Sequence, residues 1–186
     1  MFPLVILAGT IEALTAVPYI IDIVKGKTRP AIVSWSTWLL LSIIAAVASF
    51  AEGAVTSGVI ASALGIESLL IIAFSLRQGH FTYTRFDGYC QAGALLGVLL
   101  WYVTSDPLLG IVTFVVIDFI GAMPTFRHSW RRPWEETLIT FALSILGNGL
   151  ALATIPEYTA TATLVPLYLF SVNTALSGTI FFRRKM

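Results

Sequence analysis

Charged residues are scarce in this sequence. Lysine, arginine, aspartate and glutamate make up 11% of the 186 residues, whereas a soluble domain carries about 25%. Hydrophobic residues account for 57%, and the mean hydropathy is +0.87. So few charges cannot cover a surface that faces water. The composition therefore excludes a soluble globular domain and indicates an integral membrane protein.

The residue types that enzymes and metal sites need are also rare. The single cysteine, Cys90, excludes an internal disulfide framework. His80 and His128 fall in separate predicted loops, and neither has a second ligand at metal-site spacing. We therefore expect no enzyme activity, metal, cofactor or nucleic-acid partner. One enzymatic alternative, an intramembrane aspartyl protease using Asp118, is disfavoured because the Phe-Ile-Gly-Ala that follows does not resemble that family's aspartate motif.

Long apolar segments fill the chain instead. A membrane-spanning helix needs about 20 mostly apolar residues, and charge clusters, glycines and prolines divide the chain into seven such segments. Backbone polar groups in lipid must be bonded within their own segment, and no segment alternates apolar and polar residues, so we expect helices. The N-terminus lacks a basic region and predicts a first span, not a cleaved signal. The predicted spans are residues 3–23, 31–50, 56–76, 88–104, 108–126, 134–154 and 160–182.

Basic residues are confined to one side of these spans. All 11 lysines and arginines follow the first, third, fifth or seventh span. The opposite loops carry only the acids Glu52, Asp106 and Glu157. The positive-inside rule then places the N-terminus outside and the C-terminus in the cytoplasm, and we expect the plasma (inner) membrane of a prokaryote. Aromatic residues at predicted span ends, as in interfacial belts, are Trp101, Tyr102, Trp130, Trp134 and Tyr158.

Two parts of the sequence match at one offset. The matched positions, 106 residues apart, are Pro18 and Pro124, Glu12 and Asp118, and Glu67 and Asn173. After each proline, a short basic loop closes on Arg-Pro. We expect a duplication, with residues 1–78 and 107–186 as two three-helix units and residues 79–106 as a loop and linker helix. A single linker span gives both units the same orientation, related by an axis along the membrane normal.

This architecture resembles the PQ-loop/SWEET superfamily of seven-helix transporters. That superfamily includes the SWEET sugar facilitators, cystinosin-like amino-acid exporters and the PnuC vitamin carriers. Its Pro-Gln dipeptide stands here as Pro18-Tyr19 and Pro124-Thr125, so the glutamine is missing twice. The resemblance implies an all-α membrane fold of two parallel three-helix repeats joined by a linker helix.

The resemblance also implies roles for particular residues. In SWEET proteins a pair of asparagines on spans three and seven faces the substrate, and the matching positions here are Glu67 and Asn173. Only one asparagine of the pair is kept. By the same analogy, the set of prolines at helix hinges is Pro18, Pro30, Pro124 and Pro133.

Three acids lie deep within predicted spans, and no lysine or arginine lies there to pair with them. They are Glu12, Glu67 and Asp118. A charge at the bilayer centre costs about 2.5–3.5 kcal/mol on insertion scales, so such residues face a bundle interior or a water-filled cavity. We expect Glu12 and Asp118 to face each other and to couple transport to protons, with Glu67 contacting substrate. The alternative is that each acid is neutral and bonded to a neighbouring polar group.

Other polar residues within the spans have two interpretations. Asn148 and Asn173 are candidate substrate ligands, although a lone asparagine in a span is as often a link between helices. Thr15, Tyr19 and Asp22 extend the Glu12 face at helical spacing, either as a polar seam or as a substrate path. Trp35 and Trp38 begin the second span; interfacial anchoring is the first interpretation, and stacking of Trp38 on substrate the second.

These features predict a small secondary transporter or facilitator that moves a sugar, an amino acid or a vitamin-like solute by alternating access. Rocking of one three-helix unit against the other would expose the site to each side in turn. The alternative is a receptor on the same scaffold, as in the receptor that retrieves escaped endoplasmic-reticulum proteins. Expected partners are the solute and the lipid bilayer, with a homo-oligomer left open.

Overall fold

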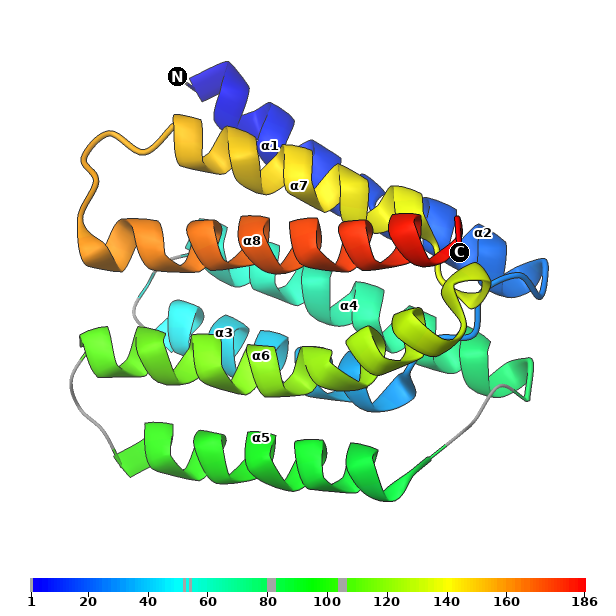
Figure 1. Ribbon diagram of the computed structural model, residues 1–186. Coiled ribbons are helices and arrows are strands. Elements are labelled where there is room, and N and C mark those ends of the chain that lie inside the picture. Colours follow the sequence, from blue (N-terminus) through cyan, green and yellow to red (C-terminus); the bar gives the residue numbers. More distant parts are fainter. Residues whose placement is uncertain (1, 52, 54, 80–82, 104–106) are drawn as a thin grey trace.

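Helices form all the regular structure in the computed structural model, which describes residues 2–51, 53, 55–79, 83–103 and 107–186 (Figure 1). The helices run side by side along one direction, and the N- and C-termini lie at opposite ends of the bundle (Figure 1). In chain order the elements are α1 (Phe2–Leu14), α2 (Ala16–Val24), α3 (Ile32–Ala51), α4 (Val55–Arg77), α5 (Arg85–Val103), α6 (Pro107–Arg131), the 3-10 turn η1 (Pro133–Glu135), α7 (Leu138–Ala153) and α8 (Ala160–Arg183).

Several helices are long and apolar enough to cross a membrane. Within the described residues, four stretches qualify: Leu7–Val24, Ile60–Arg77, Leu109–Arg131 and Ala162–Arg183. Shorter apolar helices cover Ile32–Ala48 and Leu138–Ala153. Large aliphatic side chains are exposed along most helices, as at Val47, Leu99 and Val103. A surface of this kind suits lipid and not water, in agreement with an integral membrane protein.

The helices pack in a definite order. The fourth helix, α4, packs against both α2 and α3, and α8 packs against both α6 and α7. The contacts between these two groups are made by α1 and α2 with α7 and by α3 with α6. Helix α5 lies at the edge of the bundle, against α6 and the adjoining part of α3 (Figure 1).

Aromatic and aliphatic side chains form a core near one end of the bundle, which we call the basic end because Lys25, Arg132 and the C-terminal arginines lie there. Trp35 is only 5% exposed, and its ring lies 5.0 Å from that of Tyr19. Interfacial anchoring of Trp35 is therefore wrong: the residue is part of the core. The buried members are Tyr19, Ile23, Trp35, Ile71, Phe141, Leu176 and Ile180.

The first predicted span is divided into α1 and α2, and the boundaries of α6 and α7 also differ from those predicted. Helix α6 continues to Arg131, past the expected end at Phe126, so His128 is helical and not in a loop. Helix α7 begins only at Leu138, because Pro133 starts a separate 3-10 turn. Glu52, His80, Asp106 and the side chains of Trp101 and Tyr102 lie outside the described residues.

Exposed aromatic side chains do mark the ends of several helices. Trp130, Trp134 and Tyr158 are all more than half exposed, at 58%, 69% and 67%. The guanidinium of Arg183 stacks over the ring of Trp130 at 4.7 Å, and that of Arg184 over Trp134 at 5.0 Å. Aromatic rings paired with cations at helix ends are typical of residues at a membrane interface.

Candidate functional site

Glu12 accepts hydrogen bonds from two side chains of α7. The amide of Asn148 donates to Glu12 Oε1 at 2.7 Å, and the hydroxyl of Ser144 donates to Oε2 at 3.2 Å. Gly147 makes this approach possible, because a Cβ atom at that position would lie 2.5 Å from Glu12 Oε1. Asn148 also donates to the backbone oxygen of Ser144 at 2.9 Å, so both of its N–H donors are used.

Thr15 connects Glu12 to Glu67. Its hydroxyl donates to the backbone oxygen of Glu12 at 2.7 Å and lies 3.2 Å from Glu67 Oε1. A hydroxyl has a single proton, so the short bond to the backbone leaves Thr15 Oγ1 as an acceptor. A neutral Glu67 that donates its own proton to Oγ1 satisfies both distances. We call the group formed by Glu12, Thr15, Glu67, Ser144 and Asn148 the Glu12 cluster.

The Glu12 cluster lies where the first predicted span is interrupted. Helix α1 ends at Leu14 and α2 begins at Ala16. The backbone N–H of Thr15 bonds the oxygen of Glu12, three residues back, at 3.1 Å. The backbone oxygen of Thr15 accepts from Thr140 Oγ1 at 3.0 Å. Thr15 keeps helical dihedral angles (φ −62°, ψ −33°), so side chains of α1, α4 and α7 meet around a one-residue interruption of the helix.

Asp118 is the centre of a second group of polar side chains. It lies in α6 and is 6% exposed. The phenol of Tyr168, from α8, donates to Asp118 Oδ2 at 2.6 Å, and the side chain of Trp38, from α3, also hydrogen-bonds to this carboxyl. We call these three residues the Asp118 cluster. It draws on α3, α6 and α8.

The two clusters contain one pair of contacts that the sequence offset relates. Position 118 lies 106 residues after position 12, and Ser144 lies 106 residues after Trp38. The structure brings Glu12 to Ser144 and Asp118 to Trp38. Each acid is therefore bonded by a side chain from the other half of the chain, at matched positions.

Glu12 and Asp118, which the duplication is expected to place facing each other across its axis, do not bond each other directly in the described structure, and their facing across the axis stays a prediction. Their helices, α1 and α6, are not packed against each other in the described part of the chain. Glu12 is linked to Glu67 through the hydroxyl of Thr15, and Asp118 bonds Tyr168. Each matched acid therefore bonds a side chain from the other half of the chain, and the two acids do not bond each other.

The asparagines behave differently from each other. Asn148, which the repeat did not support, is the closest partner of Glu12. Asn173 donates to the oxygen of Leu169 in its own helix at 2.8 Å, and no contact with Glu67 is among those of the described residues. Asn173 thus stays a predicted substrate ligand that the structure does not join to its matched acid.

A polar seam closes the basic end of the bundle. Tyr19 donates to Glu136 Oε2 at 2.8 Å, and Thr137 donates to Asp22 Oδ2 at 3.1 Å. The hydroxyls of Thr28 and Thr137 lie 2.6 Å apart. Thr15, Tyr19 and Asp22 therefore bond to neighbouring elements, which is the seam interpretation of their helical spacing.

Sequence reasoning missed Glu136, because no pattern distinguishes it from an ordinary loop acid. The structure makes it 1% exposed, and burial raises its pKa to about 8, although the hydrogen bond from Tyr19 opposes the shift. Its other oxygen, Oε1, has no hydrogen-bond partner in the described structure. Glu136 is therefore a buried acid whose charge depends on pH and on the contacts of the seam.

The four prolines lie at different kinds of position. Pro18 is the third residue of α2, one turn after the break, and Pro124 lies inside the continuous helix α6. Pro30 precedes α3, and Pro133 begins η1. Proline removes a backbone donor and clashes with the carbonyl four residues earlier. For Pro18 that carbonyl belongs to Leu14, the last residue of α1.

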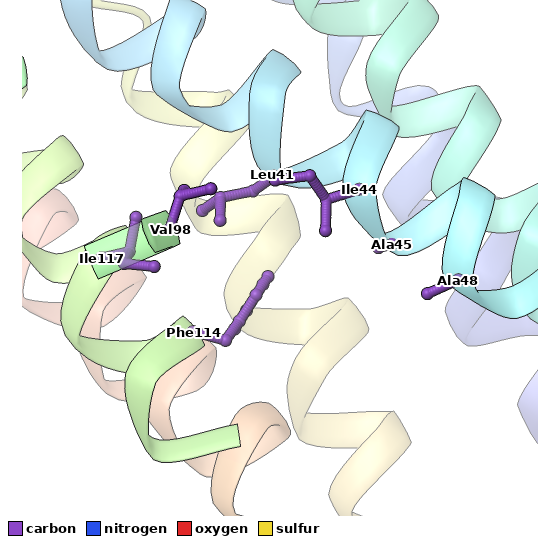
Figure 2. Close-up of a pocket in the computed structure, with 7 residues that line it drawn as sticks. All are labelled: Leu41, Ile44, Ala45, Ala48, Val98, Phe114 and Ile117. Atoms are coloured by element: carbon purple, nitrogen blue, oxygen red, sulfur yellow. The ribbon is translucent and has the colours of Figure 1, made fainter. Parts of the chain in front are cut away.

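A small cavity lies beside the Asp118 cluster. Its volume is about 90 Å³, and it opens among α3, α5 and α6. Figure 2 shows Leu41, Ile44, Val98, Phe114 and Ile117 around it. Its lining is apolar throughout, so it offers no partner to a polar solute.

Comparison with known proteins leaves these clusters to be interpreted from their own geometry. No protein-family model matches the chain, and no curated protein or solved structure is significantly similar to it. The two carboxyl clusters and the seam at the basic end are therefore the features of this protein that indicate its function.

Proposed function

We propose that this protein is a small secondary transporter that moves a small polar solute by alternating access. The observation that carries the proposal is the crossed pair of contacts, Glu12 with Ser144 and Asp118 with Trp38, at positions one offset apart. Membrane-buried acids face bundle interiors or solute paths. Acids placed between two matched halves are where a transporter built from repeats has its site.

The packing order supports a duplicated unit. In residues 1–78 the third helix, α4, touches the other helices, and α8 does the same in residues 107–186. Between the halves, the first helix of each packs on the second helix of the other. An axis along the membrane normal produces this exchange. Residues 79–106, with α5, would then be the linker, in the arrangement that the PQ-loop/SWEET resemblance implies.

Alternating access would require the polar seam to open. In this structure Tyr19, Thr28 and Asp22 of the first half are bonded to Glu136 and Thr137 of the second half. Separation of these contacts would expose the acids to the basic end. The geometry of Thr15 fits proton coupling. Its hydroxyl proton is used in the short bond to the backbone oxygen of Glu12, so Oγ1 can accept a proton donated by a neutral Glu67. Loss of that proton would remove the Glu67–Thr15 bond.

The transport proposal is tested in proteoliposomes. A screen of sugars, amino acids and vitamins for thermal stabilisation of the purified protein supplies the substrate, and counterflow of that substrate then shows transport. Binding without counterflow would contradict the proposal and favour a receptor. We expect an imposed pH gradient to drive accumulation in the wild type.

Substitution of the acids separates coupling from transport itself. Glu12→Gln, Glu67→Gln and Asp118→Asn each imitate the neutral acid, and we expect them to abolish accumulation driven by the gradient. Glu157→Gln, at an exposed acid outside the helices, is the matched control and should behave as the wild type. Wild-type rates in all three variants, with no effect of the gradient, would make the acids structural and the protein an uncoupled facilitator.

The proposed orientation places the basic end in the cytoplasm, as the positive-inside rule indicates. Cys90 is buried and is replaced by alanine, so that an added cysteine is the only thiol. With Glu157→Cys we expect labelling from outside by a membrane-impermeant maleimide, and with Lys185→Cys no labelling until the membrane is opened. The reverse pattern would overturn the orientation.

A further inference from the structure

A second cavity lies at the basic end, away from both carboxyl clusters. Its volume is about 230 Å³, and it lies between the start of α3, the start of α5 and the end of α6. These three segments come together at the end of the bundle that carries the C-terminus (Figure 1). Its polar lining residues are Thr84, Asp87, Arg127, His128, Arg131 and Arg132.

Positive charge exceeds negative charge in this cavity. Three arginines and one aspartate line it. Arg127 is tied to the wall: its Nη1 donates to Thr84 Oγ1 at 2.6 Å and lies 4.0 Å from Asp87 Oδ1. Arg132 shares Glu135, at 3.4 Å, with His128. Arg131 is exposed, and no ion pair is recorded for it among the described residues.

The start of α3 contributes backbone donors to the same cavity. Ala31, Ile32 and Val33 line it; Ile32 and Val33 begin a helix of 20 residues, and Ala31 immediately precedes that helix. Amide N–H groups in a first helical turn have no partner within the helix, and the helix dipole favours an anion there. The cavity is therefore lined both by an excess of arginine side chains and by the start of a helix.

We infer that this cavity binds a phosphate group, supplied either by the headgroup of an anionic lipid or by a soluble phosphate compound. Arginine suits phosphate because its planar guanidinium can donate two parallel hydrogen bonds. Basic pockets between helices on the cytoplasmic side are known to accept anionic lipid headgroups. The site is separate from the proposed solute path and does not depend on transport.

Binding here would join elements of both halves of the chain. The ligand would contact α3 from the first half, α5 from the linker, and α6 from the second half. Pro124 also lines the cavity. A phosphate group bound here would therefore hold these helix ends together, and so stabilise the state in which the basic end is closed.

The test measures thermal unfolding of the purified protein in a neutral detergent. The probes are short-chain phosphatidylglycerol, short-chain phosphatidylcholine, inorganic phosphate, and sodium chloride at matched ionic strength. We expect phosphatidylglycerol, inorganic phosphate or both to raise the unfolding midpoint by several degrees, with phosphatidylcholine and chloride giving no comparable rise. An effect of phosphatidylglycerol alone identifies a lipid headgroup, and an effect of inorganic phosphate identifies the free anion as sufficient.

Matched double variants decide whether the cavity is responsible. Arg131→Gln with Arg132→Gln removes two charges from the cavity, whereas Lys25→Gln with Lys27→Gln removes two exposed charges from a loop at the same end. We expect the cavity variant to bind the active probe at least roughly tenfold more weakly than the wild type, because charge-assisted hydrogen bonds are lost. The loop variant should bind as the wild type does. Equal weakening in both variants, or no stabilisation of the wild type by either phosphate probe, would overturn the proposal. Circular dichroism of each variant checks that it is folded.

Discussion

The helices that begin the two matched regions, α1–α2 and α6, carry a proline at the same relative position but have different shapes. The first is interrupted between Leu14 and Ala16, and the second runs unbroken from Pro107 to Arg131. Figure 1 shows the C-terminal part of α6 bending without a break. A proline is therefore not enough to interrupt a helix in this protein.

The difference lies in the residue three positions before each proline. In the first helix it is Thr15, whose hydroxyl bonds the oxygen of Glu12 and whose backbone oxygen accepts from Thr140. In α6 it is Gly121, which has no side-chain donor and packs against Thr37. A backbone group within a membrane that loses its partner in the helix needs another partner. The first helix has them, and α6 has no equivalent hydroxyl.

This contrast distinguishes the effect of the matched prolines from the effect of the residues around them. The prolines weaken both helices at equivalent places, but only the polar residues around Thr15 convert the weakness into a break. The break also carries the Glu12 cluster, whereas Asp118 sits on a continuous helix.

The largest expected effect comes from Gly147. In Gly147→Ala the new Cβ would lie 2.5 Å from Glu12 Oε1, so the carboxyl must leave its position beside Asn148. Overpacking of this kind costs about 1–3 kcal/mol of stability. We expect a lower unfolding midpoint together with loss of transport in proteoliposomes.

Two glycine variants give the comparison its controls. Gly121→Ala would meet Thr37 Cγ2 at 2.6 Å, a similar clash that displaces a methyl group and not an acid. It should lower the midpoint but spare most of the transport. In Gly149→Ala the Cβ makes only an ordinary contact of 3.5 Å with Phe170, and both measurements should stay at wild type. Equal transport in Gly147→Ala and Gly121→Ala would show that displacing Glu12 is unimportant.

The prolines give an intermediate effect. Pro18→Ala restores a backbone donor beside the break, and Pro124→Ala restores one within a helix that is already continuous. We expect both variants to fold and to transport more slowly, with Pro18→Ala the slower. Initial rates of counterflow measure this. A slower Pro124→Ala, or wild-type rates in both and in the double variant, would contradict the assignment of the first helix as the main hinge.

The positions of the helices could be predicted from the sequence because lipid imposes a simple requirement. A run of apolar residues between basic loops must become a helix, and the predicted spans coincide closely with α3, α4 and α8. The break at Thr15 could not be predicted in the same way. The proline indicates a weak place, but the interruption lies one turn earlier, at Thr15, whose backbone oxygen accepts a hydrogen bond from Thr140.

The site was harder to predict, because contacts between helices depend on how each helix is rotated. The three acids could be identified from their cost in lipid, but not their partners. Asn148 meets Glu12 only because α7 turns Gly147 toward α1. In the sequence, Glu136 resembles an ordinary acid in a loop. It is buried because η1 ends beside Tyr19, which bonds its carboxyl group.

The last prediction concerns pH at the seam, where the two halves differ again. Tyr19, after Pro18, bonds the buried acid Glu136, whereas Thr125, after Pro124, donates its backbone N–H to Ser34 Oγ at 3.2 Å. Only the first contact contains an acid. Burial raises the pKa of Glu136 from 4.5 to about 8, and the charge of Glu135 adds to the rise. The hydrogen bond from Tyr19 and the charge of Arg184 oppose it.

The sign of the pH dependence follows from that shift. Below about pH 4.5 Glu136 is protonated in both the folded and the unfolded state, and between about 4.5 and 8 only the folded state keeps the proton, so stability falls as pH rises and levels off above this range. We therefore expect the unfolding midpoint of the wild type to decline between about pH 6 and pH 8. In Glu136→Gln, whose amide is neutral throughout and can still accept from Tyr19, this part of the decline should disappear. Glu135→Gln changes the neighbouring, less buried acid and should keep it. An unchanged slope in Glu136→Gln would mean that Glu136 is already ionised in the folded protein, and the seam would then respond to pH no differently from its counterpart at Thr125.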